Sequence, residues 1–230
     1  MSLPTPGSPS LSERLDAVRE RVAEAATTAG RVGDDITIIV VTKFHPASLI
    51  RELAALGVHD IGENRHQEAQ AKAAELADVE LNWHFVGQVQ GKKARQVRSY
   101  ANVIHSVDRP ALVDALVSTE HEVACFLQVN LTDDTGRGGV DPAGVEPLAE
   151  RVLAAPGLRL LGLMAVAPLG AEARRSFAQV RELGERVRML APEATSLSMG
   201  MSQDFPDAIA EGATHLRIGT AITGNRPAER

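Results

Sequence analysis

The sequence predicts an α/β protein in which eight parallel strands close into a barrel, with helices outside it and one extra helix at the N-terminus. Short apolar runs recur along the 230 residues, and each is followed by a segment with helical periodicity. The connections are only a few residues long, which is typical of parallel strands joined by right-handed crossovers. The first run, 36–42, lacks alternating polar positions, as expected of a strand covered on both faces. These observations favour a (β/α)8 TIM barrel.

The first element after an N-terminal tail is a helix. Residues 1–9 are rich in Pro, Ser and Gly, so we expect a disordered tail followed by a single domain over 10–230. Ser10 with Glu13 three positions later is typical of a capping box that opens a helix, and Gly30 ends it. The apolar stripe of this helix is Leu11, Leu15, Val18, Val22 and Ala25.

The rest of the chain alternates between strands and helices. Strands are expected where β-branched and apolar residues cluster, at 36–42, 58–61, 83–86, 103–106, 123–129, 159–165, 195–199 and 215–218. Helices are expected between them, near 46–56, 64–77, 90–100, 110–119, 142–155, 171–190 and 204–211. An open doubly wound sheet is the alternative fold. It usually has fewer strands and a glycine-rich first turn, whereas the first turn here, 42–45, contains no glycine.

Composition excludes several classes of function. A net charge of -6 argues against nucleic acid as the main partner. The N-terminus lacks the pattern of a signal peptide and no apolar run reaches membrane-spanning length, so we expect a cytoplasmic protein without a membrane contact. The single cysteine, Cys125, rules out a disulfide within the chain and is expected to be buried and inert. No His-Glu-x-x-His motif or His/Cys cluster indicates a metal site.

One basic segment, 92–98, stands out from this acidic background. It carries Lys92, Lys93, Arg95 and Arg98 on a predicted helix, and a solvated helix face is the favoured interpretation. A protein interaction module that uses this helix and needs no cofactor remains a separate hypothesis.

The ends of the predicted strands collect the residues that carry chemistry. Parallel barrels build their sites at the carboxyl ends of the strands, so these residues are expected to share one face. Lys43 places a primary amine at the end of the first strand. The other candidates are Asn64 after the second strand, His84 within the third, Met164 near the end of the sixth, Ser202 after the seventh, Arg217 within the eighth, and Gly219 and Thr220 after it.

The last two loops indicate a phosphate site. Barrels often bind phosphate between the loops after strands seven and eight, where glycines let backbone N–H groups approach an anion and hydroxyls add donors. An amine and a phosphate cradle on one face suggest a ligand with a carbonyl and a phosphate, as in pyridoxal 5'-phosphate (PLP). We expect Lys43 to be buried, which favours the neutral amine that condenses as a Schiff base. Asn64 and His84 could orient the ring, although ordinary core hydrogen bonding explains them equally well.

Motifs along nearly the whole chain resemble the pyridoxal phosphate homeostasis proteins, also called the YggS-like or proline synthase co-transcribed family. They include segments 41–43, 61–64, 83–87, 162–164, 197–202 and 217–222. The resemblance implies a fold-type III PLP-binding barrel similar to the barrel domain of alanine racemase, with the Schiff base on Lys43. It also implies phosphate binding by Ser202, Gly219 and Thr220, Asn64 beside the ring, and Arg217 facing the pyridine nitrogen. Phe44, Arg65, Lys92 and Arg137 depart from the family pattern at the rim, and the Lys43 and phosphate positions are intact.

Two functions fit this resemblance. A PLP-dependent amino-acid racemase of the alanine racemase type needs a second acid/base group opposite the lysine, which in alanine racemase is a tyrosine from another subunit's second domain. The only tyrosine, Tyr100, ends a predicted helix remote from the strand ends, and we expect no second domain. An arginine at the pyridine nitrogen weakens the ring as an electron sink, which argues against other PLP-dependent reactions. Racemases of this fold type have the same arginine, so the missing second base is the stronger argument against racemisation. We therefore expect a protein without catalytic residues, a monomer that stores PLP or delivers it to PLP-dependent apo-enzymes and so affects amino-acid and keto-acid balance indirectly.

Overall fold

The computed structural model describes residues 9–132, 134 and 136–225, so all but Pro9 of the expected tail 1–9 lies outside the described residues. The first helix, α1 (Leu11–Thr28), begins with the expected capping box. Ser10 N donates to Glu13 Oε2 over 2.7 Å, and Glu13 N donates to Ser10 Oγ over 3.2 Å. The stripe of α1 ends on buried Ala26 instead of Ala25, because position 26 lies one turn after Val22.

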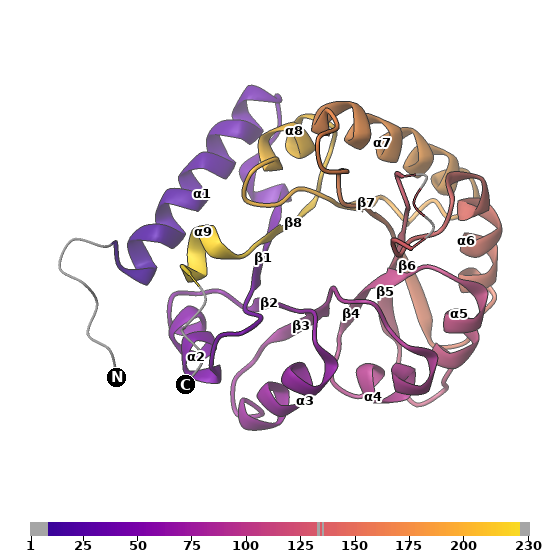
Figure 1. Ribbon diagram of the computed structural model, residues 1–230, viewed down its shortest axis with the longest axis horizontal. Coiled ribbons are helices and arrows are strands. Elements are labelled where there is room, and N and C mark those ends of the chain that lie inside the picture. Colours follow the sequence, from indigo (N-terminus) through magenta and orange to yellow (C-terminus); the bar gives the residue numbers. More distant parts are fainter. Residues whose placement is uncertain (1–8, 133, 135, 226–230) are drawn as a thin grey trace.

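Eight parallel strands form a closed barrel in sequence order, with β8 pairing back onto β1, which confirms the predicted fold class (Figure 1). The strands are β1 (Thr37–Val41), β2 (Asp60–Glu63), β3 (Asn82–Phe85), β4 (Val103–Val107), β5 (Val123–Gln128), β6 (Leu158–Met164), β7 (Ser196–Ser198) and β8 (His215–Ile218). Closure removes every free sheet edge, so the carboxyl ends of all the strands surround one opening.

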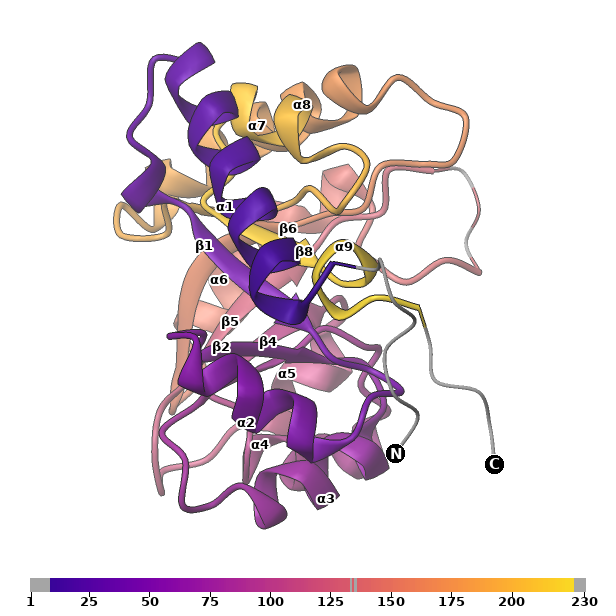
Figure 2. The same ribbon diagram turned by 90° about the vertical axis from the view of Figure 1, so that its left-hand side faces the viewer.

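Helices cover the outside of this barrel (Figure 1). They are α2 (Ala47–Ala55), α3 (His66–Glu75), α4 (Ala94–Arg98), α5 (Pro110–Leu116), α6 (Val145–Leu153), α7 (Ala173–Leu190), α8 (Phe205–Ala210) and α9 (Thr220–Thr223), with 3-10 turns at 33–35, 91–93 and 142–144. The extra helix α1 packs against α8 and α9 (Figure 2). No helix in the described ranges is long and apolar enough to cross a membrane.

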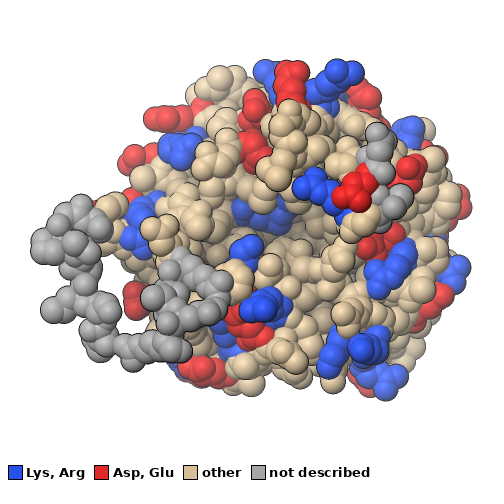
Figure 3. Space-filling view, in the orientation of Figure 1, with Lys and Arg blue, Asp and Glu red and all other residues tan. Residues whose placement is uncertain are grey.

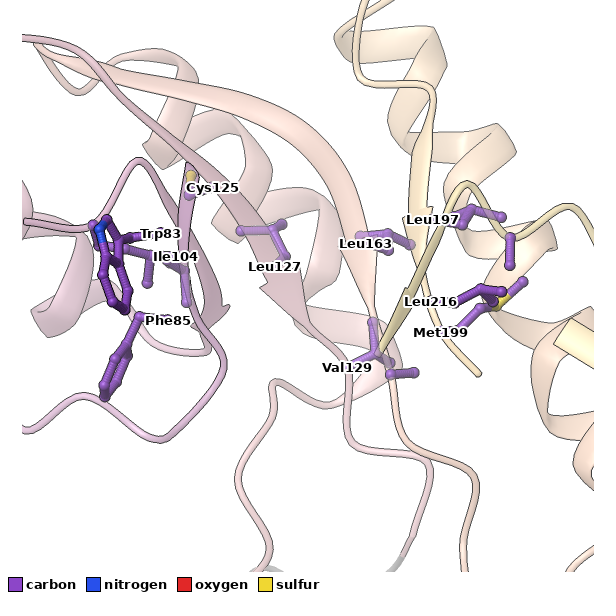
Figure 4. Packing of buried hydrophobic residues seen from close by; sticks show 14 of the residues in the cluster. Trp83, Phe85, Ile104, Cys125, Leu127, Val129, Leu163, Leu197, Met199 and Leu216 are labelled. Carbon is purple, nitrogen blue, oxygen red and sulfur yellow. The ribbon is translucent and has the colours of Figure 1, made fainter. Parts of the chain in front are cut away.

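The core has two layers because successive strand residues point to opposite faces of the sheet. The outer layer lies between strands and helices and includes Trp83, Phe85, Leu127 and Leu163 (Figure 4). A smaller cluster consists of Val103, Ala124, Phe126 and Met164, which alternate with the outer-layer residues along their strands. Cys125 is fully buried in the outer layer, where burial raises the pKa of its thiol to about 12, in agreement with the expected inert thiol.

Two local predictions were wrong. Strand β2 lies two residues later than the expected 58–61, because its register aligns Ile61 with Val40, and Gly62 therefore belongs to the strand. A Cβ atom at Gly62 would lie 3.0 Å from Ile39 Cγ2, so this position has little room for a side chain. The basic segment is not a uniformly solvated face either. Arg98 is buried and donates to the carbonyls of Leu116 and Gly157 over 2.9 and 3.0 Å, as a structural residue.

Candidate functional site

A cavity of about 460 Å³ opens at the carboxyl ends of the strands. Seven of the eight candidates from the sequence line it: Lys43, Asn64, Met164, Ser202, Arg217, Gly219 and Thr220. The space-filling view shows a hollow near the centre of this face, with Lys and Arg side chains in and around it (Figure 3). The size lies within the range of about 300–1,000 Å³ typical of small-ligand sites.

Lys43 lies in a tight turn directly after β1. The turn is closed by His45 N, which donates to Thr42 O over 3.0 Å. Contrary to the expected buried amine, Lys43 is exposed at the cavity mouth, because the chain leaves the barrel wall at Thr42 and turns outward. Its Nζ atom lies 5.9 Å from the centre of the Phe44 ring, and it forms no hydrogen bond or ion pair with the described residues. The amine is therefore available to a ligand, because the side chain is exposed and has no competing partner among the described residues.

Arg217 forms part of the cavity wall, and hydrogen bonds to Ser198 and Ala165 fix its guanidinium. It is 6 % exposed. Its Nη1 donates to Ser198 O and Ser198 Oγ over 2.7 and 2.8 Å, and its Nη2 donates to Ala165 O over 2.8 Å. Burial lowers the pKa of Arg217 to about 10, so the guanidinium remains charged at neutral pH. It is a fixed cation whose hydrogen-bond acceptors, among the described residues, are all neutral.

His84, the eighth candidate, is not among the residues that line the cavity, so the prediction that it orients a ligand ring is not supported. It lies in the middle of β3, below the strand ends. His84 Nε2 is 2.9 Å from Asp60 Oδ1, and His84 Nδ1 is 2.9 Å from His105 Nε2. His105 Nδ1 is in turn 2.9 Å from Ser198 Oγ. His84 thus has the alternative role, a hydrogen-bonded core histidine.

A largely buried series of hydrogen bonds runs from Arg217 through Ser198, His105 and His84 to Asp60. Arg217 can only donate, so Ser198 Oγ accepts from it. Asn82 Nδ2 lies 3.0 Å from His84 Nε2 and donates to Asp60 Oδ1 over 2.7 Å. Burial lowers the pKa of His105 well below its usual value, so this imidazole is neutral. The series connects the cavity arginine to a carboxylate 157 positions away in the sequence.

The loops after β7 and β8 form the other end of the cavity. Gly200 has a φ of 93°, and a Cβ atom there would lie 2.6 Å from Ala208 Cβ, so the turn into α8 needs a glycine. Met201 N donates to Asp204 Oδ1 over 2.6 Å, which fixes the loop that carries Ser202. Thr220 begins α9, where the first N–H groups of a helix lack intrahelical acceptors. Hydroxyls and unpaired amides therefore surround this end of the cavity, as an anion requires.

Asn64 contributes an unsatisfied acceptor to the cavity. Its Oδ1 atom is buried and has no hydrogen-bond partner in the described part of the chain. Buried polar atoms without partners are rare, and those in a cavity wall indicate a ligand that supplies the partner. The backbone around Asn64 is tightly constrained, since a Cβ atom at Gly87 would lie 2.1 Å from Asn64 O.

No tyrosine lines this cavity. The Tyr100 hydroxyl lies 3.3 Å from His66 Nδ1, its ring packs edge-on against Phe85, and burial raises the pKa of its phenol. The described residues contain no group of three or more His, Cys, Asp or Glu side chains that could hold a metal ion.

Several lining residues were not among the candidates from the sequence, including Gln128, Gln203 and Asp204. Gln128 is the last residue of β5 and lay inside the expected strand 123–129, so a rule that selects the residues after each strand did not find it. Gln203 and Asp204 follow Ser202 in the same loop, and a polar loop sequence alone does not show which side chains point inward.

Comparison with known proteins agrees with the observed barrel fold and with the PLP ligand that the sequence predicts. The family model described as alanine racemase, N-terminal domain, matches residues 14–227. The pyridoxal phosphate homeostasis protein of Pseudomonas aeruginosa is 41% identical over 222 residues, covering 94% of this chain and 96% of that protein. The protein of the same name in Escherichia coli is 36% identical, with coverages of 94% and 97%.

Solved structures agree with these relatives. PipY of Synechococcus elongatus, solved with PLP bound, is 38% identical, has a TM-score of 0.82 and covers 94% of this chain and 100% of its own. Alanine racemase of Corynebacterium glutamicum is only 18% identical, with a TM-score of 0.67 and coverages of 90% and 60%. The racemase likeness therefore extends to the fold alone.

Proposed function

Because the chain belongs to the pyridoxal phosphate homeostasis protein family, we propose that it binds PLP and takes part in intracellular PLP homeostasis, storing or delivering the cofactor without turning over a substrate. The effect on amino-acid and keto-acid balance is then indirect. The relatives named above carry this function in their names, whereas the racemases are similar only in fold.

One observation carries the proposal: a single cavity brings together an amine, a fixed cation, two hydroxyls and an unsatisfied amide oxygen. This donor set fits PLP. The Lys43 amine would hold the aldehyde end, and Ser202, Gly219 and Thr220 would bind the phosphate. Asn64 would lie beside the ring, with Met164 as an apolar wall. Arg217 would face the pyridine nitrogen, where a fixed positive charge disfavours protonation of that nitrogen.

The link to Lys43 would be a Schiff base. Lys43 Nζ would hold the aldehyde carbon of the cofactor, with the release of one water. Bound PLP supplies an electrophilic carbonyl and a conjugated ring that can accept electrons. Arg217 would weaken the ring as an electron acceptor, because its positive charge disfavours protonation of the ring nitrogen. The residues of this chain therefore hold the cofactor while limiting its use as an electron sink.

A spectrum and a borohydride reduction test the proposal. Protein incubated with PLP should turn yellow, and reduction should attach the cofactor irreversibly to the peptide that contains Lys43. Lys43→Ala should abolish this attachment. Lys93→Ala is the matched control, since Lys93 lines a neighbouring pocket and not the cavity, and it should leave attachment intact. A protein that takes up no PLP would overturn the proposal, and attachment to Lys93 in the wild type would reassign the lysine.

We further propose that the protein acts as a cytoplasmic monomer and hands PLP to apo-enzymes. The exposed position of Lys43 at the mouth of the cavity supports this, because an acceptor or solvent can reach the link without opening the barrel. Loaded protein should reconstitute a PLP-dependent apo-enzyme faster than PLP dissociates into buffer, and sedimentation should give the mass of one chain. Transfer that is no faster than dissociation would contradict direct delivery and leave storage.

A further inference from the structure

A cluster of three charged residues, two of them buried and one half-buried, lies beside the turn that carries Lys43. Glu63 ends β2, and Glu68 and Lys72 lie one turn apart on α3. Lys72 Nζ donates to Glu63 Oε1 over 2.6 Å and to Glu68 Oε1 over 2.7 Å. The side chains of Lys72 and Glu63 are only 7% and 1% exposed. None of the three lines the cavity.

All three residues bond to Thr42 or Phe44, the residues on either side of Lys43. Lys72 Nζ donates to Thr42 O over 2.9 Å, and Thr42 Oγ1 donates to Glu63 Oε1 over 2.7 Å. On the other side of the lysine, Phe44 N donates to Glu68 Oε1 over 2.6 Å. The residues before and after Lys43 are thus attached to one ion cluster.

The turn needs such support because its backbone is strained. Phe44 has a φ of 69° and is the only non-glycine residue in the described ranges with a positive φ. Glycine is the residue that normally occupies this conformation, and a side chain there persists only when the surroundings enforce it. The hydrogen bond from Phe44 N to Glu68 acts at this strained residue.

Stability alone is a weak explanation of the cluster. Buried ion pairs have a large desolvation cost, and apolar residues of the same volume often stabilise a core equally well. The cluster also has two carboxylates for one ammonium, and Glu63 Oε2 has no hydrogen-bond partner in the described chain. Its geometric role, in contrast, is specific, because each of the three residues makes a hydrogen bond with Thr42 or Phe44, the two neighbours of Lys43.

We infer that Glu63, Glu68 and Lys72 are positioning residues that hold the Lys43 amine at the cavity mouth in the orientation needed for covalent attachment of PLP. This inference rests on the proposed function. It places the determinant of attachment outside the cavity, on α3 and β2, and separates it from the residues that would bind the phosphate and the ring.

A comparison of two ligands distinguishes a displaced Lys43 amine from a misfolded cavity. PLP attaches to the lysine, whereas pyridoxine 5'-phosphate has the same phosphate and ring but no aldehyde. Glu68→Ala removes the acceptor of Phe44 N and should slow attachment of PLP by about tenfold or more, since small displacements of a reacting group have effects of this size. Its affinity for pyridoxine 5'-phosphate should stay within about twofold of wild type. Glu75→Ala, an exposed position on the same helix, is the matched control and should change neither.

A second substitution tests the role of strain. Phe44→Gly removes the strained side chain, so the turn should need Glu68 less, and Glu68→Ala in the Phe44→Gly background should slow attachment by a smaller factor than in the wild type. Unchanged attachment in Glu68→Ala, equal loss of both ligands, or an equal effect in the two backgrounds would each overturn the inference. Absence of attachment in the wild type would instead refute the proposed function, so the two failures are distinguishable.

Discussion

The hydroxyl of Ser198 lies 2.9 Å from Nδ1 of His105 and connects the buried histidines of the barrel to the arginine of the cavity. Ser198→Ala removes the hydrogen-bond partner of His105 Nδ1 and one acceptor of Arg217. A buried nitrogen without a partner should lower the free energy of unfolding by about 1–3 kcal/mol, measured by urea denaturation. Ser196→Ala in the same strand is the control, because its hydroxyl has no hydrogen bond in the described structure, and it should stay within about 0.5 kcal/mol. Equal losses of unfolding free energy in Ser198→Ala and Ser196→Ala would show that the hydrogen bonds of Ser198 contribute no stability.

The histidines of the barrel interior predict a loss of stability in mild acid. Burial lowers the pKa of His215 to about 4, and it lowers the pKa of His105 well below its usual value. The unfolded state then binds more protons than the folded state below about pH 6.5, so this contribution is complete above that pH and declines as the pH falls toward 4. His215→Gln should flatten the dependence by up to about 1.4 kcal/mol per pH unit in this window. Urea titrations at pH 7.5, 6, 5 and 4.5 measure this dependence. If stability falls with pH equally in the wild type and in His215→Gln, His215 is not a source of the acid sensitivity.

Two glycines in the loops after β7 and β8, Gly200 and Gly219, should respond differently to substitution. Gly200→Ala places a Cβ 2.6 Å from Ala208 Cβ in a left-handed conformation, and it should cost about 1–3 kcal/mol of stability and weaken PLP binding by moving the loop of Ser202. At Gly219 the nearest atom, Val41 O, is 3.6 Å from a Cβ, so Gly219→Ala should fold with wild-type stability. Thermal and urea unfolding of both variants test this difference, and a destabilised Gly219→Ala would refute it.

The phosphate assignment predicts a selective loss of affinity. Ser202→Ala and Thr220→Val each remove a hydroxyl that would bond to a charged group, so each should weaken PLP binding by about tenfold. Neither should change the weaker binding of pyridoxal, which lacks the phosphate. Equilibrium dialysis with both ligands measures the effect. A variant that loses both ligands to the same extent would place these hydroxyls elsewhere in the site.

Amino-acid turnover provides the test against the racemase alternative. The loaded protein should exchange the α-proton of L-alanine in deuterated water no faster than free PLP at the same concentration, because no tyrosine in the described structure lines the cavity. Proton NMR follows the exchange. Tyr100→Phe should behave as wild type, since the Tyr100 hydroxyl contacts His66. Exchange at a catalytic rate would defeat the carrier function.

Much of the site follows from strand ends alone. A parallel barrel places the carboxyl ends of its strands around one opening, so Lys43, Ser202, Arg217 and Thr220 could be assembled from the sequence once eight strand-helix repeats were recognised. Local patterns were also sufficient for the capping box of α1 and for the burial of Cys125. These features depend on the order of residues and on the fixed geometry of helices and strands.

The sequence could not place residues whose environment depends on depth in the barrel or on register. His84 was selected with the strand-end residues, yet its position in the middle of β3 puts it among core histidines. Lys43 was expected to be buried, and the outward turn at Thr42 exposes it. Gln128, the last residue of β5, lines the cavity but lay inside the expected strand 123–129 and was not selected. Periodicity gives the type of an element but not its end or its depth.

By itself, then, the sequence determined the strand-helix repeats and the amine at the end of the first strand, because these depend on local patterns of residues. Only the tertiary structure decided that Lys72 and Glu68 hold the turn of Lys43, and that Ser198 joins Arg217 to His105. Those contacts link different strands and helices, where distances are set by barrel closure and side-chain packing, and no local pattern encodes them.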